Sequence, residues 1–256
     1  MQYEFFDVDV SDHVALVTLN RPPVNAHNWQ VREEMTRLFD SFNDRDDVRV
    51  AVLTGAGKTF CAGADIKERA SMTEEGAYWQ HARRVREASN SIRECAKPVI
   101  AAVNGVALGA GMGLAMACDI VIASEAASFG MPEIDIGLAG GAAFMGVLFS
   151  RSVARQLMYT GKRVPAAELY RLGVISACVK PEALMDEAMK LAREIASKSP
   201  IGIRYAKMSF NTVEEMPRRD GYRFEQNVTH ILSQTEDAQE AKRAFLEKRK
   251  PVFKGK

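Results

Sequence analysis

The segment VIAAVNGVALGAGMGLAMACDIVIA, residues 99–123, contains the pattern that decides the fold. It opens with the apolar run 99–103 and closes with the run 119–123, as expected of two buried strands. Between them, glycines at 105, 109, 111 and 113 lead into a short apolar helix. Backbone N–H groups at a helix start have no intrahelical partner, so this turn could hold an anion or an oxyanion. The same glycines could equally serve close packing of the helix on the strand.

Outward from this segment, strands and helices alternate. Residues 13–19 and 48–54 are predicted strands, and apolar residues recur at helical spacing between them. A helix is expected from Thr73 to about Ala96. Helical patterns dominate from Ala142, and no strand is expected from 200 to 250. The pattern predicts an α/β core over residues 1–199 that carries a C-terminal helical subdomain, residues 200–256.

Composition excludes several classes of function. The 256 residues include 34 Lys and Arg against 33 Asp and Glu, which gives a net charge of +1. This balance argues against nucleic acid or an anionic membrane as the main partner. No stretch reaches the ~18 apolar residues of a membrane span, and residues 1–10 lack the basic residues of a targeting peptide. The 4 scattered cysteines are typical of a reducing cytoplasm, most of them are expected to be buried thiols, and no metal site is expected.

Two segments resemble nucleotide-binding motifs, but each lacks a glycine that its motif requires. The sequence 55–59 ends like a phosphate-binding P-loop, but that loop requires glycine at position 52, where the chain has Val52. The turn at 109–113 follows a strand as a dinucleotide fingerprint would, but its last glycine is replaced by Leu114. A tight turn is therefore predicted at 55–59, and a nicotinamide-dependent oxidoreductase is disfavoured.

Two further segments could supply catalytic groups. The sequence FCAGADIK, residues 60–67, is a second run of small residues after a strand, and its backbone could point a second N–H donor at the same oxygen. The segment 129–137 places Glu133 and Asp135 among apolar residues, where burial would raise a carboxyl pKa. Either carboxylate could instead face water. Histidines 13, 27, 81 and 230 share no catalytic spacing and are interpreted as surface or satisfied side chains.

Taken together, these segments resemble the crotonase superfamily, also called the enoyl-CoA hydratase/isomerase family. The resemblance rests on Leu19–Pro22, Phe60–Glu68, Lys97–Gly105, Leu108–Asp119, Phe129–Gly137 and Glu247–Lys250. It implies a crotonase-like spiral of ββα turns, a homotrimer or hexamer held partly by the C-terminal helices, and an acyl-CoA thioester substrate. It implies no cofactor, since CoA is part of the substrate.

The resemblance also assigns residues. Ala64 and Ala110 match the two positions whose backbone N–H groups form an oxyanion hole, Glu133 matches a catalytic carboxylate, and Gly141 matches a backbone position that can hold a water molecule. Contacts to CoA or to the acyl group are implied for Arg21, Asn25, Ala26, Ala62, Asp65, Ile66 and Phe144, and, from a neighbouring subunit, for Phe253 and Lys254.

One departure from the family pattern affects the reaction. Hydratases of the family have a first glutamate where this chain has Gly113. Hydration divides its proton transfers between two carboxylates, whereas moving a proton along an acyl chain needs only one. The sequence therefore favours isomerase-like or lyase-like chemistry, although Asp135 could replace the missing group. Hydroxycinnamoyl-CoA hydratase-lyases also lack the first glutamate, but their substrate-gripping tyrosine aligns with Phe224, beside Tyr222. A CoA-thioester-binding pseudoenzyme is a further alternative.

Overall fold

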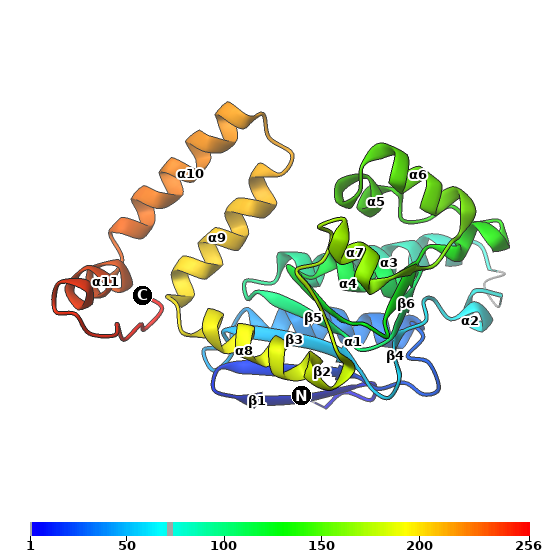
Figure 1. Cartoon of the computed structure of the whole chain (residues 1–256), viewed down its shortest axis with the longest axis horizontal. Helices are drawn as coiled ribbons and strands as arrows, with labels where there is room; N and C mark the ends of the chain where they lie inside the picture. Colours follow the sequence, from blue (N-terminus) through cyan, green and yellow to red (C-terminus); the bar gives the residue numbers. More distant parts are fainter. Residues whose placement is uncertain (1, 71–73) are drawn as a thin grey trace.

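The larger of two sheets forms the base of the core (Figure 1). The computed structural model describes residues 2–70 and 74–256. The larger sheet has the order β1-β2-β3-β5-β7-β10, with β1 antiparallel and the others parallel. Its strands are β1 (Phe6–Ser11), β2 (Val14–Leu19), β3 (Val50–Gly55), β5 (Val99–Val103), β7 (Ile120–Ser124) and β10 (Ala177–Val179).

The two faces of this sheet are buried in separate cores. Alternate residues of a strand point to opposite faces. Val50 and Val52 accordingly pack against α8 (Leu184–Ala196), while Ala51 and Leu53 face α1 (Trp29–Phe42) and the smaller sheet. Because both faces are covered, the strands read as continuous apolar runs rather than alternating patterns.

The smaller sheet turns the core into a spiral. It has the order β4-β6-β8-β9, from β4 (Thr59–Cys61), β6 (Val106–Leu108), β8 (Ser128–Gly130) and β9 (Val164–Pro165). Each long strand, β3, β5 or β7, leads to a short strand of the smaller sheet and then to a helix. The helices of these turns are α2 (Ile66–Ala70), α3 (Ala77–Glu94), α4 (Ala110–Ala117), the 3₁₀ helix η1 (Pro132–Ile136) and α5 (Ala142–Leu148). The ββα spiral implied by the family resemblance is confirmed.

The remaining helices lie on two sides of this core. Above it in Figure 1 are α5, α6 (Arg151–Thr160) and α7 (Ala166–Arg171), and a short 3₁₀ helix η2 (Pro181–Ala183) precedes α8. To the left extend α9 (Pro200–Val213), α10 (Arg218–Ser233) and α11 (Glu236–Leu246). The buried Lys207 joins α9 to the core, since its Nζ donates to the Ile92 carbonyl at 2.9 Å and to Asp119 Oδ2 at 2.8 Å.

Most elements expected from the sequence are present. The helix expected at 73–96 is α3, Ala77–Glu94, although its expected start at Thr73 lies outside the described residues. The strands β4, β6 and β8 were not predicted because their three residues each are too few to show periodicity. The turn predicted at 55–59 is confirmed, and the amide of Asn104 donates to the Gly55 carbonyl at 2.9 Å beside it. Cys61, Cys95 and Cys118 are buried free thiols, and Cys178 is half-buried.

Candidate active site

Three loops meet where parallel strands of the smaller sheet end. Cys61 of β4 pairs with Ala107 of β6, and Leu108 of β6 pairs with Gly130 of β8. The segments that follow the strands therefore leave the sheet side by side. The carboxyl ends of parallel strands are where α/β proteins place their ligands. We call these segments the 62–65 loop, the Gly109 turn (residues 109–113) and the Glu133 segment (residues 131–137).

The 62–65 loop and the Gly109 turn are in direct contact. A Cβ atom built on Gly63 would lie 2.8 Å from the Leu108 carbonyl oxygen and 3.8 Å from the Ala110 nitrogen. Only glycine allows this approach. In the described part of the chain, the N–H groups of Ala64 and Ala110 donate to no acceptor. Ala110 is the first residue of α4, so its N–H lacks an intrahelical partner and points along the positive end of the helix.

The Glu133 carboxylate lies directly against the Gly109 turn. A Cβ atom on Gly109 would lie only 2.1 Å from Glu133 Oε1. The other oxygen, Oε2, is buried and has no hydrogen-bond partner among the described residues. This burial raises the pKa of Glu133 above the ordinary range of a glutamate. A carboxylate of this kind is suited to taking up a proton.

Asp135 lies elsewhere, which corrects the idea that it replaces the missing glutamate. Its Oδ2 would be 3.0 Å from a Cβ built on Gly161, at the end of α6, and the residue is exposed. At Gly113, where hydratases of the resembled family have their first glutamate, a Cβ would meet nothing within 4 Å. A Cβ atom at this position would therefore be unobstructed, and the chain has no carboxylate there.

Gly141 is the N-cap of α5 and has a backbone conformation that favours glycine, with φ of 91°. A Cβ there would lie 2.2 Å from the terminal methyl of Met131, two residues before Glu133. Phe144, one turn along α5, is half-buried. Gly141 therefore caps, and Phe144 belongs to, the helix that follows the Glu133 segment, but their roles toward water and the acyl group stay predictions.

An ion pair fixes the 62–65 loop to the segment after β2. The Arg21 guanidinium donates to Asp65 Oδ2 at 2.8 Å and to the Ala26 carbonyl at 2.8 Å. This pairing lowers the pKa of Asp65. Asn25 is 2% exposed, and its amide donates to the Thr59 carbonyl at 2.7 Å. Its side chain is occupied within the protein, so a contact from Asn25 to a ligand would have to come from its backbone.

The other residues predicted to contact CoA lie in two places. Ala62, whose N–H donates to the Val24 carbonyl at 3.0 Å, is half-buried in the 62–65 loop, and Ile66 follows it with 66% of its surface exposed. Phe253 and Lys254 belong to the C-terminal tail instead. The Phe253 carbonyl accepts from Arg49 at 3.3 Å, near the amino end of β3. They are therefore not brought to the 62–65 loop of their own chain.

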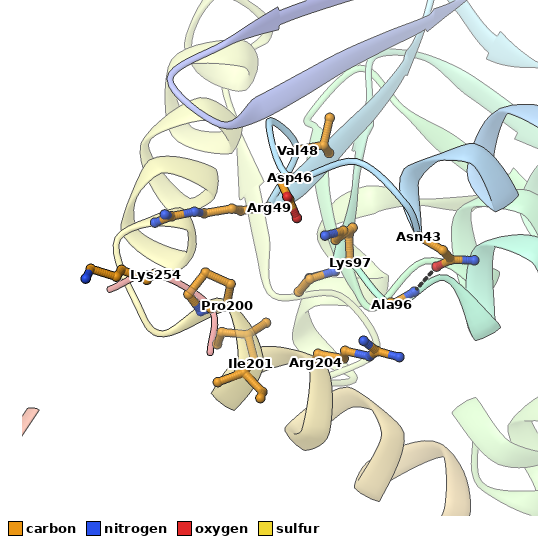
Figure 2. Close-up of a pocket in the computed structure, with 13 residues that line it drawn as sticks. Asn43, Asp46, Val48, Arg49, Ala96, Lys97, Pro200, Ile201, Arg204 and Lys254 are labelled. Carbon is orange, nitrogen blue, oxygen red and sulfur yellow. Dashed lines mark hydrogen bonds between the residues drawn. The ribbon is translucent and has the colours of Figure 1, made fainter. Parts of the chain in front are cut away.

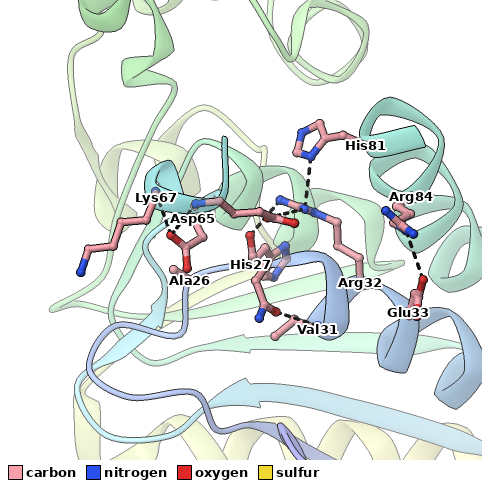
Figure 3. Close-up of polar contacts among 12 residues, drawn as sticks. Ala26, His27, Val31, Arg32, Glu33, Asp65, Lys67, His81 and Arg84 are labelled. Atoms are coloured by element: carbon pink, nitrogen blue, oxygen red, sulfur yellow. Dashed lines mark hydrogen bonds and ion pairs between the residues drawn. The ribbon is translucent and has the colours of Figure 1, made fainter. Parts of the chain in front are cut away.

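The buried residues His27 and Arg32, which the sequence analysis did not predict to have a role, hold the 62–65 loop in place. The His27 N–H donates to the Gly63 carbonyl at 2.8 Å, and the His27 carbonyl accepts from Asp65 at 2.9 Å. That carbonyl also accepts from the guanidinium of Arg32 at 2.8 Å. Arg32, 2% exposed, pairs in turn with Glu68 at 3.1 Å (Figure 3). Arg32 thus links the His27 backbone, which pairs with the 62–65 loop, to Glu68 in the helix that follows the loop.

The interpretation of His27 as a surface or satisfied residue is wrong. Its ring is buried, and Nε2 has no partner among the described residues. Burial, with the charges of Arg32 and Arg21, lowers the pKa of His27 to about 3, so the ring is neutral. The sequence contained one signal for this cluster. Arg32 follows Val31 on the apolar stripe of α1, where a charged residue needs a buried partner.

Neither a metal cluster nor a membrane span is evident in the described part of the chain. Across residues 2–70 and 74–256, no three His, Cys, Asp or Glu side chains are grouped so as to hold a metal ion. Within the same residues, no helix combines the length and apolar composition needed to cross a membrane.

Comparison with known proteins gives a consistent result over the whole chain. Residues 9–256 match the family model described as enoyl-CoA hydratase/isomerase. The chain is 37% identical to the (E)-benzylidenesuccinyl-CoA hydratase of Thauera aromatica, covering 97% of this chain and 98% of that protein. It is 36% identical to the carnitinyl-CoA dehydratase of Citrobacter koseri, with 94% of each chain covered.

Comparison with solved structures gives the same result. The enoyl-CoA hydratase from Bacillus anthracis superposes with a TM-score of 0.94 at 35% identity, covering 99% of this chain and all of that one.

Proposed function

Because this chain belongs to the enoyl-CoA hydratase/isomerase family, whose members act on acyl-CoA thioesters, we propose that it shifts a proton along the acyl chain of such a thioester. Glu133 takes the proton from the α-carbon, and the electrons of that C–H bond move into the thioester carbonyl as an enolate. Protonated Glu133 then returns the proton to the γ-carbon, which moves the double bond. One carboxylate, acting first as base and then as acid, completes the cycle.

The observation that carries this proposal is the contact between the Glu133 carboxylate and the Gly109 turn. The carboxylate would be 2.1 Å from a Cβ on Gly109, and the next residue, Ala110, has an N–H without an acceptor in the described chain. A thioester oxygen bound to the N–H groups of Ala64 and Ala110 would hold its α-carbon next to a base. In other enzymes one such donor contributes about 3–4 kcal/mol to the transition state.

A second candidate function is hydration or dehydration with Glu133 as the only carboxylate. The names of the Thauera and Citrobacter relatives, a hydratase and a dehydratase, favour it. A panel of 2-enoyl-, 3-enoyl- and aryl-enoyl-CoAs, followed by absorbance and product analysis, separates the possibilities. Conversion of 3-enoyl- into 2-enoyl-CoA supports the isomerase, and 3-hydroxyacyl-CoA as the main product supports the hydratase. Cleavage of the aryl substrate would indicate a hydratase-lyase, and binding without turnover a pseudoenzyme.

Gly113→Glu tests the role of the missing carboxylate. The space around Gly113 is open, so the variant should fold and place a second carboxylate beside the Gly109 turn. We expect faster addition of water to crotonyl-CoA, because two carboxylates can divide the proton transfers of hydration. Gly113→Gln is the matched control, since it adds the same bulk without a base. Equal hydration rates in the two variants would contradict the expected role.

We also propose that the chain assembles into trimers, alone or in pairs. Large apolar side chains are exposed on the C-terminal helices, among them Phe210 at 76%, Phe245 at 82% and Leu246 at 81%. Exposed apolar groups in such number are typical of an interface. Sedimentation equilibrium at micromolar concentration should report a trimer or hexamer, and a stable monomer would overturn this part of the proposal.

A further inference from the structure

A cavity lies on the side of the larger sheet where β3 and β5 begin. It has a volume of about 350 Å³ and is closed by the start of α9 and by the C-terminal tail (Figure 2). Its lining residues come from four separate parts of the chain. They are Asn43, Asp46, Val48, Arg49, Ala96, Lys97, Pro98, Pro200, Ile201, Ile203, Arg204, Lys254 and Gly255.

The charges on this lining do not balance. Arg49, Lys97, Arg204 and Lys254 contribute four cations against the single carboxylate of Asp46. In Figure 2, Lys97 lies between Arg49 and Lys254 on one side and Arg204 on the other. Among the described residues, the charged ends of Lys97, Arg204 and Lys254 pair with no acidic side chain, Asp46 included. An excess of like charge in a partly enclosed space is unfavourable unless an anion compensates it.

The Lys97 ammonium group is partly buried among these charges. Burial is the main cause that lowers its pKa; Cys95 and Asp46 act in the opposite direction, and Arg204 and Arg49 lower it further. An anion in the cavity would offset the repulsion from the two arginines. An anion that binds next to the Lys97 side chain should therefore gain more interaction energy than it would on an open surface.

Hydrogen bonds fix the positions of two of the cationic residues, Arg49 and Lys97. Arg49 donates to the Ala196 carbonyl at 3.1 Å and to the Phe253 carbonyl at 3.3 Å, which ties α8 and the tail to the start of β3. The Lys97 carbonyl accepts from the buried Lys207 at 3.2 Å. The opposite wall is the first turn of α9, a helix of 14 residues whose amino end carries a partial positive charge. The Arg49 guanidinium and the backbone of Lys97 are thus held in place by contacts within the protein, while Arg204 and Lys254 are exposed side chains.

We propose that this cavity binds a small phosphate-bearing anion at a site separate from the acyl-CoA site, with Lys254 acting here rather than toward the CoA of a neighbouring subunit. Phosphate is the anion class that fits best, because its several oxygens can accept from cations on different walls at once. Apolar walls at Val48, Pro98 and Ile201 leave room for a small organic group attached to the phosphate. The cavity lies where β3 and β5 begin, whereas the loops of the proposed active site follow the short strands of the smaller sheet.

Binding of inorganic phosphate, measured by calorimetry on the intact protein at constant ionic strength, tests the proposal directly. We expect saturable binding that weakens about tenfold in Lys97→Gln and in Arg204→Gln, since each substitution removes one charge-assisted contact. Lys242→Gln is the matched control, because it removes the same charge from an exposed position on α11. This control should bind phosphate as the wild type does.

The KM for the acyl-CoA substrate shows whether the cavity binds a free phosphate compound or the phosphates of CoA. We expect the two cavity variants to retain the wild-type KM for the acyl-CoA substrate, as a separate site requires. A parallel rise in KM would mean that the cavity receives the phosphates of CoA, and the proposed separate site would be wrong. Absence of saturable phosphate binding, or equal affinity in wild type and Lys97→Gln, would also overturn it. Because phosphate binding is measured without turnover, either result is independent of the proposed reaction.

Discussion

Glu133→Gln should lower turnover by about 10²–10⁴-fold while leaving acyl-CoA binding nearly unchanged. The amide keeps the shape of the side chain, and it occupies the same buried position against Gly109, but it cannot take up a proton. The rate constant is measured on whichever enoyl-CoA the wild-type protein converts, and affinity is measured by calorimetry with a non-reacting acyl-CoA.

Glu125→Gln is the control for this experiment, because Glu125 is exposed on the turn between β7 and β8. It should behave as the wild type. If Glu133→Gln retained wild-type turnover, another group would have to move the proton, and the proposed site would fail.

The pH dependence of turnover is an independent test of the role of Glu133. Glu133 must be ionised to act as a base, so wild-type turnover should rise with pH through the pKa of this group. Because burial raises that pKa, the rise should occur above the ordinary pH range of a glutamate. The residual activity of Glu133→Gln should lack this step, whereas Glu125→Gln should keep it.

Gly109→Ala should reduce turnover by about 10²-fold or more through a steric effect alone. A methyl group at this position would lie 2.1 Å from Glu133 Oε1, so the carboxylate must move away from the Gly109 turn. The backbone, with φ of 52° and ψ of −119°, also disfavours alanine. A displacement of about 1 Å at reacting groups is enough for a 10²-fold loss.

Gly113→Ala is the matched control within the same turn. A methyl group there would meet nothing within 4 Å, and Gly113 lies inside α4 with an ordinary backbone. It should leave turnover near the wild-type value. Circular dichroism and the oligomeric state of both variants show whether Gly109→Ala is still folded. A folded Gly109→Ala protein with full activity would mean that the Glu133 carboxylate is not used where the structure places it.

Sequence patterns predicted an α/β core with a C-terminal helical region, and the resemblance to a known family added the ββα spiral and the assignments of Ala64, Ala110 and Glu133. The core strands could be predicted because they depend on local patterns. Apolar runs define strands buried on both faces, and the glycines at 63 and 109 allow an approach that any other residue would block. Such information is contained in neighbouring residues, so it could be recognised without coordinates.

Only the tertiary structure shows where the two carboxylates of the Glu133 segment lie. Residues 132–136 form a 3₁₀ helix, in which each residue turns about 120° from the last. Glu133 therefore faces the Gly109 turn while Asp135 faces Gly161, which an alternating pattern in the sequence could not indicate. Likewise, His27 and Arg32 support the 62–65 loop through contacts between segments more than thirty residues apart. Contacts of this kind form only when the chain has folded, because they depend on where β2, α1 and β4 meet in space.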